Sequence, residues 1–307
     1  MNDPTSGAMV IAGQGGGKST FIGAFIAYIR DIEAVKWQGD YEMIYGQKEE
    51  FNDHIYDRVK NQYEYPEQTN RVDTYVVRAK TNTDDTYSAQ RNLTMMDIPG
   101  EVQETAVDEA RNRIRTGNWD EQDVRDAYEN GIGNNRPIRE KLNDGIGLSD
   151  KEEEKLYLYQ YLSANRIVFL LNLWKFINHP QMDPVLTSDL IERVAREKRT
   201  LLLVTAADEI DYDPDTFGSG ALSKIVSSFS VSSRMFDYNL YEYIQSTNKL
   251  PPNQRTSDIG ALLRAAKNND CSMFSIAVPE GNHGIAMDGA SIKTQGFENI
   301  VKWLMVK

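Results

Sequence analysis

The stretch MVIAGQGGGKST, residues 9–20, sets a short apolar run directly before a glycine-rich turn. The apolar run at residues 9–12 suits a buried strand, and residues 21–30 suit a helix because their apolar side chains recur at helical spacing. The turn and the start of the helix are formed by Gly13, Gln14, Gly15, Gly16, Gly17, Lys18, Ser19 and Thr20. The sequence therefore predicts a strand, a glycine loop and a helix in direct succession.

This succession is the arrangement of a phosphate-binding P-loop, here in the form A-x-x-x-x-G-K-S from Ala12 to Ser19. Glycines allow successive backbone N–H groups to point at one anion, and the helix N-terminus adds a partial positive charge. We expect Lys18 to reach the β- and γ-phosphates and the Ser19 hydroxyl to bind Mg²⁺. A glycine-rich surface turn is the alternative, but the flanking strand and helix favour the P-loop.

Composition limits the function classes. The 307 residues, 40% of them hydrophobic, suffice for one large α/β domain with insertions or for two small domains. The net charge of −12 disfavours non-specific binding to nucleic acid. The single cysteine, Cys271, forms no disulfide framework and favours a cytoplasmic location. No apolar run is long enough to predict a transmembrane segment, and peripheral association with a membrane through a partner stays open.

Apolar runs elsewhere predict the other strands. Residues 74–80 and 90–96 have strand composition and are joined by a short polar turn, which indicates an antiparallel pair. Residues 166–171 and 200–205 are continuously apolar, as in parallel strands covered on both faces, and residues 273–278 form the last predicted strand. Strands that alternate with helices predict an α/β fold with a doubly wound, mostly parallel sheet and one antiparallel strand.

The predicted helices occupy the intervals between strands. Ser149 and Glu152 have the spacing of a capping box, which opens a helix that reaches about residue 162. Residues 31–69 mix aromatic and charged side chains and predict one or two helices near residues 48–61, followed by a mobile segment. Further helices are predicted at residues 187–199, 259–267 and 297–305.

Two short motifs follow predicted strands. Asp97-Ile98-Pro99-Gly100 comes after the strand at residues 90–96, at the sheet edge where α/β folds bind ligands. A carboxylate there can hold Mg²⁺ directly or through water, and the N–H of Gly100 can contact a terminal phosphate. Alone, these are ordinary turn residues, and the preceding P-loop makes the motif more specific.

The second motif is Thr205-Ala206-Ala207-Asp208, directly after the strand at residues 200–205. A carboxylate at the end of a buried strand can accept hydrogen bonds from the N1–H and the exocyclic amine of guanine. Adenine offers no such pair of donors. The alternative is that Asp208 only caps the next turn.

In this order the motifs resemble those of the Ras-like (TRAFAC) class of P-loop GTPases. The resemblance covers most of the chain as a scaffold and implies a single Ras-like G domain over residues 1–307. Small members of the class are much shorter, so helical insertions are expected at about residues 31–68, 101–163 and 209–257.

The resemblance also implies roles for single residues. The loop of residues 13–17 wraps the phosphates, and Thr20 and Thr205 join the nucleotide site. Asp97 holds the outer coordination shell of Mg²⁺, Gly100 senses the γ-phosphate, and Asp208 reads the base. Ala277 offers its backbone N–H to the guanine O6. The threonine that closes over Mg²⁺ is Thr69, with Thr74 as its rival.

The chain departs from the pattern of this class at three places. Thr205 and Ala206 stand where the class has Asn-Lys, so the lysine stem over the base is lost. Glu101 stands where many members carry the glutamine that orients the attacking water. Gln14 stands where fast-switching members carry glycine. The last two departures predict slow hydrolysis that needs an activator or dimerisation.

The resulting prediction is a GTP-binding switch that binds GTP or GDP with Mg²⁺ and slowly hydrolyses GTP. Lys18, Gly100 and Glu101 are its expected catalytic residues, and regulatory or effector proteins would bind through the insertions. One alternative is a non-hydrolysing nucleotide-binding adaptor. Another is an ATPase or nucleotide kinase built on the same loop.

Overall fold

The computed structural model describes residues 7–13, 16–32, 37–45, 55–66, 73–81, 91–97, 104–178, 186–215, 234–253, 258–282, 284–289 and 291–305. For residues 31, 32, 37–45, 73–81, 91–97, 104, 105 and 305, only the backbone is described.

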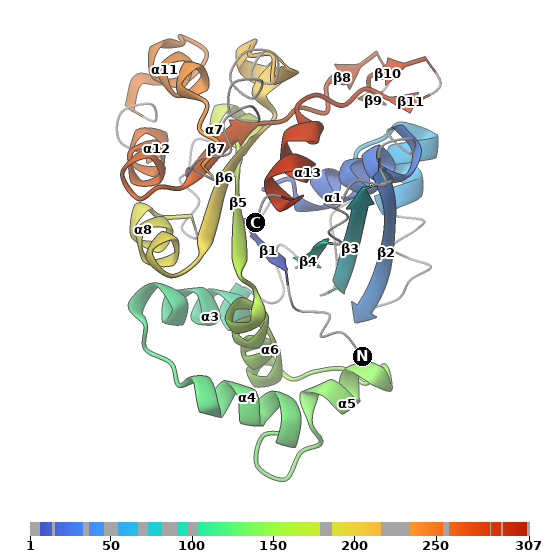
Figure 1. Ribbon diagram of the computed structural model, residues 1–307, viewed down its shortest axis with the longest axis vertical. Helices are drawn as coiled ribbons and strands as arrows, with labels where there is room; N and C mark the ends of the chain where they lie inside the picture. The colour runs from blue at the N-terminus through green and yellow to red at the C-terminus, as the bar shows by residue number, and fades with distance from the viewer. Residues whose placement is uncertain are drawn as a thin grey trace.

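A seven-stranded sheet with the order β2-β3-β4-β1-β5-β6-β7 organises the chain (Figure 1). Its strands are β1 (Ala8–Ile11), β2 (Trp37–Tyr45), β3 (Asp73–Thr81), β4 (Arg91–Asp97), β5 (Arg166–Asn172), β6 (Arg199–Thr205) and β7 (Ser272–Ser275). Strands β4, β1, β5, β6 and β7 pair in parallel, whereas β3 runs antiparallel to both β2 and β4. The predicted mostly parallel sheet with one antiparallel strand is therefore confirmed.

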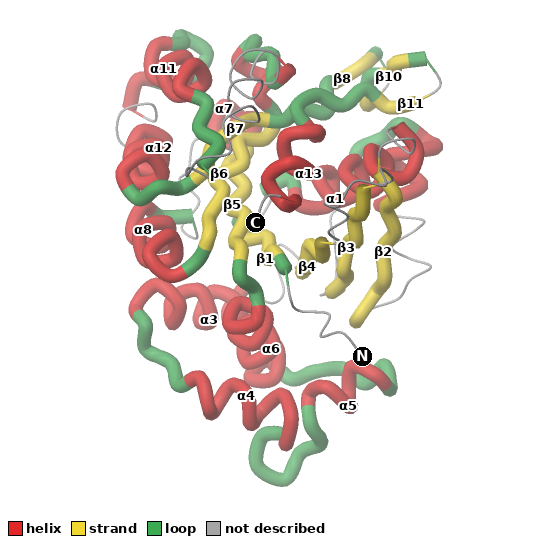
Figure 2. Tube along the Cα trace, viewed as in Figure 1, coloured by secondary structure: helices red, strands yellow, loops and turns green. Residues whose placement is uncertain are grey.

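Helices cover both faces of this sheet (Figure 2). They are α1 (Lys18–Ala27), continued by the π-helical turn η1 (Tyr28–Ile32), η3 (Arg58–Gln62), α3 (Glu104–Thr116), α4 (Glu121–Asn130), α5 (Ile138–Asn143), α6 (Asp150–Ser163), α7 (Leu173–Asn178), α8 (Ser188–Glu197), η4 (Ala207–Ile210), α11 (Tyr238–Ser246), α12 (Ile259–Asn268) and α13 (Phe297–Met305). Two short hairpins follow β7: β8 (Glu280–Gly281) with β9 (Gly284–Ile285), and β10 (Met287–Asp288) with β11 (Ser291–Ile292).

Alternate residues of the central strands enter two separate cores. Met9, Ile11 and Phe169 pack on one face with apolar side chains from α3, α6, α8 and α12. Val10 and Val168 pack on the other face with side chains from α1 and α13. Because side chains alternate along a strand, a strand buried on both faces must be apolar throughout, as β1 and β5 are. The doubly wound arrangement follows from this burial.

The main correction to the predicted elements is β2. The sequence analysis placed no strand in residues 31–69, yet β2 pairs with β3 from Trp37↔Thr81 to Tyr45↔Thr74 and extends the sheet at its edge. Residues 37–43 alternate between apolar or small and polar types, a strand signal that the many charges of the region obscured. Helical structure was expected at residues 48–61. Residues 55–62 are helical, and residues 48–54 lie outside the described residues. Helix α11 lies within the helical insertion expected at about residues 209–257, although no bounds were predicted for it, and the two hairpins were not predicted.

Helices α4 and α5 form a layer at the end of the molecule away from α7 (Figure 1). Helix α6 joins this layer to the sheet and contacts both α3 and α4. The predicted capping box at its start is confirmed, because the Glu152 carboxylate accepts from the Ser149 N–H at 2.9 Å and from its hydroxyl at 2.9 Å. The same carboxylate accepts from Lys141 Nζ at 2.7 Å, which ties α5 to α6.

Replacing Glu152 by alanine is expected to reduce the free energy of unfolding by about 3 kcal/mol, because a buried, paired carboxylate is lost and Lys141 is left without it. Burial alone would raise the pKa of Glu152, but hydrogen bonds from Lys141 and Ser149 hold it below its usual value. The contribution of ionised Glu152 to the free energy of unfolding is therefore fully present above the ordinary carboxyl pKa. It is lost as pH falls through the lowered pKa of Glu152 in the folded chain. Denaturant unfolding across that pH range measures the effect. The exposed Asp150, in the same first turn, is the control, and an equal loss in Asp150→Ala contradicts the account.

Among the described residues, no helix combines the length and the apolar character needed to cross a membrane.

Candidate functional site

The glycine loop turns tightly where it leaves β1. The Gly16 N–H donates to the Gly13 carbonyl at 3.0 Å, which closes the turn. A Cβ at Gly16 would lie 2.8 Å from the Gly13 oxygen and 3.0 Å from the Ala12 Cβ, so a larger residue does not fit there. Gln14 and Gly15 lie outside the described residues. The described part of the loop thus has the close backbone packing that a phosphate cradle requires.

Helix α1 begins at the end of this loop. Gly17 is its N-cap with a φ of 76°, a left-handed conformation that favours glycine, and the Gly17 carbonyl accepts from Phe21 N–H at 2.9 Å. The first turn of α1 carries no acidic residue, so its partial positive charge is not neutralised within the helix. Lys18 is 8% exposed, which places a buried cation beside the loop. Ser19 and Thr20 are half-buried in the same turn.

The parallel strands bring several predicted residues to one edge of the sheet. Asp97 ends β4 and Thr205 ends β6, and both strands run parallel to β1 with their carboxyl ends at the edge that carries the glycine loop. A Cβ on Gly17 would lie 3.1 Å from Asn172 Nδ2 and 3.9 Å from Thr205 Oγ1. The loop therefore packs against the ends of β5 and β6, next to the segment that carries Asp208.

The segment after β6 is joined to the segment after β7. Ala206 has a φ of 56°, which turns the chain into η4, and the Ala207 N–H donates to the Ile276 carbonyl at 3.4 Å. Asp208 is half-buried there. Burial raises the pKa of its carboxyl, the negative charge of Glu280 raises it further, and Lys293 opposes this shift. A partly desolvated carboxylate of this kind is stabilised by a ligand that offers N–H donors.

One predicted contact is not available in this arrangement. The N–H of Ala277, assigned from the sequence to the guanine O6, donates instead to the Gln295 carbonyl at 3.1 Å. Gln295 N–H in turn donates to the Ala277 carbonyl at 3.0 Å, which forms an antiparallel bridge. The last strand was predicted at residues 273–278, whereas β7 ends at Ser275, and the pairing with the distant Gln295 takes up the Ala277 amide.

Tyr65 is a site residue that the sequence analysis missed. Its hydroxyl donates to the Val278 carbonyl at 3.1 Å, in the segment after β7. Burial raises the pKa of Tyr65, as do the negative charges of Asp208, Glu280 and Glu209. The phenol is therefore within electrostatic range of the carboxylate predicted to read the base. No local pattern marks it among the many aromatic residues of this region.

Asn172 is a second missed residue, and here a signal existed. It directly follows the apolar run of β5, as Asp208 closely follows that of β6, so the same reasoning points to the same edge. Its side chain lies against Gly17 and accepts from the Lys175 N–H at 3.5 Å.

Several predicted residues cannot be placed in full. Gln14, Gly15, Thr69, Gly100 and Glu101 lie outside the described residues. For Asp97 and Thr74 only the backbone is described; Thr74 pairs with Met96 and Asp97 with Asp73, so both lie at the same end of the β3–β4 pair.

The residues present fit a phosphate-bearing ligand. The Thr205 hydroxyl is buried near Gly17, and it lacks a hydrogen-bond partner within the described part of the chain. A buried hydroxyl without a partner costs free energy, which a polar ligand in this position can recover. Gly17, the N-cap of α1, lies beside this hydroxyl, and Lys18, which is 8% exposed, is the next residue along the chain.

Replacing Gly17 by alanine is expected to weaken nucleotide binding, because a Cβ there strains the backbone and pushes against Asn172. Gly145 is a matched control: its φ is 66°, and a Cβ on it would meet nothing within 4 Å. Both variants should lose about 1 kcal/mol of stability through the left-handed backbone. Nucleotide titration and thermal unfolding separate the two effects, and equal affinity in both variants contradicts the assigned site.

The strand order and the glycine loop define an α/β fold with a doubly wound, mostly parallel sheet, an arrangement consistent with that of P-loop GTPases. The sequence matches no protein-family model, and a search of curated protein sequences finds no match. Among solved structures, one similar chain comes from the signal recognition particle receptor SRb-GTP/SRX complex of Chaetomium thermophilum. It is 13% identical, the match covers 97% of this chain and 98% of that chain, and the TM-score is 0.35. Since that score is low, the fold class rests on the strand order alone.

Proposed function

We propose that the chain is a GTP-binding protein that slowly hydrolyses GTP to GDP and phosphate. The observation that carries this proposal is the glycine turn at the carboxyl edge of the sheet, which is followed directly by the buried Lys18 and which lies next to Thr205, the first residue of the Thr205–Asp208 segment. The first half suits a polyphosphate and the second suits a base with N–H donors. Thr205 lies beside Gly17, so the two parts suit one ligand.

Catalysis would rest on position and charge. Lys18 would hold the β- and γ-phosphate oxygens, and the α1 N-terminus would add partial positive charge where negative charge develops. Ser19 and Asp97 would hold Mg²⁺, which when bound neutralises phosphate charge. Gly100 would sense the γ-phosphate through its N–H, and Thr69 would close over the site, with Thr74 as the alternative.

Base selection would depend on Asp208. Its carboxylate would accept from the guanine N1–H and the exocyclic amine, and the Thr205 hydroxyl would supply a further polar contact near the loop. The Tyr65 hydroxyl is bonded to the Val278 carbonyl and is within electrostatic range of this carboxylate, and its ring would offer an aromatic surface where the sequence lacks a lysine stem. We therefore propose guanine over adenine.

The slow rate follows from two side chains. Glu101 would stand where a glutamine orients the attacking water, and its negative charge would lie near the phosphates. Gln14 would occupy the place through which an activating arginine approaches. We infer a switch whose partners bind the insertions, with α4 and α5 the most protruding described part (Figure 1).

Single-turnover hydrolysis of bound GTP with Mg²⁺ tests the proposal. The expected result is slow, complete conversion to GDP and phosphate, which Lys18→Ala abolishes. Tight binding with no conversion would instead identify the non-hydrolysing adaptor. Equal hydrolysis of ATP would identify an ATPase and contradict the role of Asp208.

A further inference from the structure

Arg111, in the middle of α3, reaches the entrance of the glycine loop. Its Nη2 donates to the Ala12 carbonyl at 2.6 Å, across 99 positions of sequence. Its Nε donates to the Tyr157 hydroxyl at 3.3 Å, its Nη1 to Asp108 Oδ1 at 3.1 Å, and its guanidinium carbon lies 5.7 Å from the centre of the Tyr157 ring. Arg111 is 9% exposed, so this cation is held in place by contacts with three elements.

The Ala12 carbonyl is the last backbone acceptor before the loop. Ala12 is 1% exposed, and a buried carbonyl needs a donor. The next carbonyl, that of Gly13, accepts from the Gly16 N–H within the turn. The two oxygens at the loop entrance are therefore fixed by different means: one by the loop itself, and the other by a side chain from α3.

We propose that Arg111 is a positioning residue that holds the phosphate loop in its binding conformation. The proposal deepens the proposed nucleotide site and rests on it. Arg111 does not touch the ligand; it fixes the peptide from which the loop amides are oriented. A charged donor to a buried carbonyl is among the stronger hydrogen bonds in proteins, and the planar guanidinium permits the simultaneous contacts.

The position of α3 gives this contact a second consequence. Helix α3 starts seven residues after Asp97, directly beyond the segment that contains Gly100. Because Arg111 belongs to α3, a displacement of this helix would reach the loop entrance through the hydrogen bond from Arg111 to Ala12. The guanidinium also donates to the hydroxyl of Tyr157 in α6. Helix α6 belongs to the insertion at about residues 101–163, so this insertion also helps to hold Arg111.

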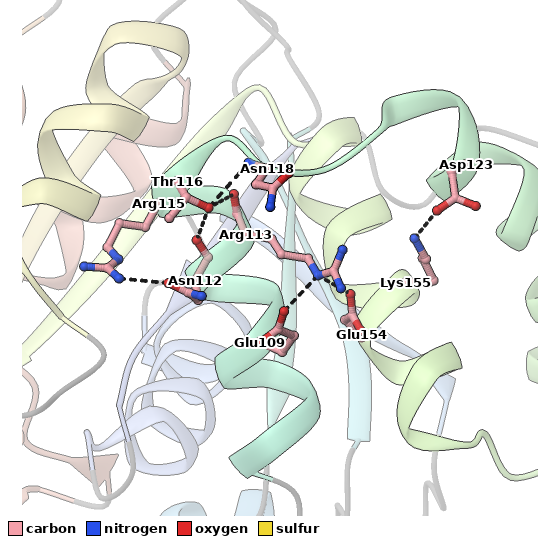
Figure 3. Close-up of polar contacts among 9 residues, drawn as sticks. All are labelled: Glu109, Asn112, Arg113, Arg115, Thr116, Asn118, Asp123, Glu154 and Lys155. Atoms are coloured by element: carbon pink, nitrogen blue, oxygen red, sulfur yellow. Dashed lines mark hydrogen bonds and ion pairs between the residues drawn. The ribbon is translucent and has the colours of Figure 1, made fainter.

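Variants of α3 test the proposal against a control on the same helix. Arg111→Met removes the donor, and Arg111→Lys keeps the charge without the planar fork. Arg113→Met is the control, because Arg113 pairs with Glu109 at 3.2 Å and with Glu154 at 2.8 Å, and Figure 3 shows it directed at these two carboxylates. Tyr157→Phe removes the hydroxyl that accepts from Arg111 without removing the ring.

Two readouts are measured on the full chain: the dissociation rate of bound GDP, and hydrogen exchange of the amides of residues 12–19 without nucleotide. Arg111→Met should raise both by about tenfold or more, Arg111→Lys and Tyr157→Phe by less, and Arg113→Met by less than about twofold. Thermal unfolding shows whether each variant is folded. If Arg111→Met does not fold, the two readouts for Arg111→Lys test the role of Arg111 instead.

The two readouts separate the inference from the proposed function. The role of Arg111 would be overturned if the loop amides of folded Arg111 variants exchanged hydrogen at the same rate as those of Arg113→Met. Faster loop exchange in a chain that binds no nucleotide would support the role of Arg111 and overturn the proposed function. Faster exchange together with faster GDP release supports both.

Discussion

Lys18→Ala is expected to weaken GTP binding at least about a hundredfold, because the variant loses the buried cation that the proposed site assigns to the phosphates. The wild-type side chain lies in a place with little water, where its attraction to phosphate is only weakly screened. The loop amides and the α1 N-terminus remain in the variant, so a residual affinity should persist. Equilibrium titration with GTP and with GDP measures the loss, which should be larger for GTP because Lys18 would also contact the γ-phosphate.

The control for this prediction is Lys151→Ala. Lys151 is an exposed lysine in the first turn of α6, on a different helix from the loop. Lys151→Ala changes the net charge by the same amount as Lys18→Ala. It should leave the affinity for GTP within about twofold of that of the wild-type chain. Equal losses in the two variants would show that the effect is only one of net charge. An unchanged affinity in Lys18→Ala would remove the basis of the assigned phosphate site.

Asp208→Asn is expected to weaken GTP binding about a hundredfold and to allow xanthosine triphosphate to bind instead. The carboxylate accepts two N–H donors, whereas an asparagine amide presents one acceptor and one donor. Xanthine has a carbonyl where guanine has its amine, so its pattern of donor and acceptor complements the amide. Competition between the two nucleotides measures this exchange of preference.

Glu209→Gln is the matched control, since burial and the charges of Asp208 and Glu280 also raise the pKa of Glu209. Glu209→Gln should leave the preference for GTP unchanged. A switch to xanthosine triphosphate in this variant would show that Glu209 reads the base and would contradict the role of Asp208. The pH dependence gives a second check. Because burial raises the pKa of Asp208, its ionised form is lost as pH falls through that raised value, and GTP affinity should fall with it. In Asp208→Asn this acid loss should be absent.

The sequence predicts those parts of the fold whose signals are local. The runs of β5 and β6 are apolar throughout, so they indicate strands covered on both faces, and the Ser149–Glu152 spacing alone identifies the start of α6. Strand β2 was missed because aromatic and charged residues hid its alternation, and its pairing with β3 depends on residues about forty positions away.

The same distinction applies to the candidate site. The glycine loop is a continuous motif, and its tight turn is visible in the sequence. Arg111 and Tyr65 reach the site from distant segments. No local sequence motif distinguishes either of them from the other arginines or tyrosines nearby. The bridge in which the Ala277 amide pairs with Gln295 was not foreseen for a similar reason, because no local spacing encodes it.

The most direct test is an equilibrium titration of the purified chain with GTP and with ATP in the presence of Mg²⁺. The proposed site predicts that GTP saturates one site per chain and that ATP competes at least about a hundredfold more weakly. No saturable binding of either nucleotide, or equal affinity for both, would contradict a guanine-nucleotide site at this edge of the sheet.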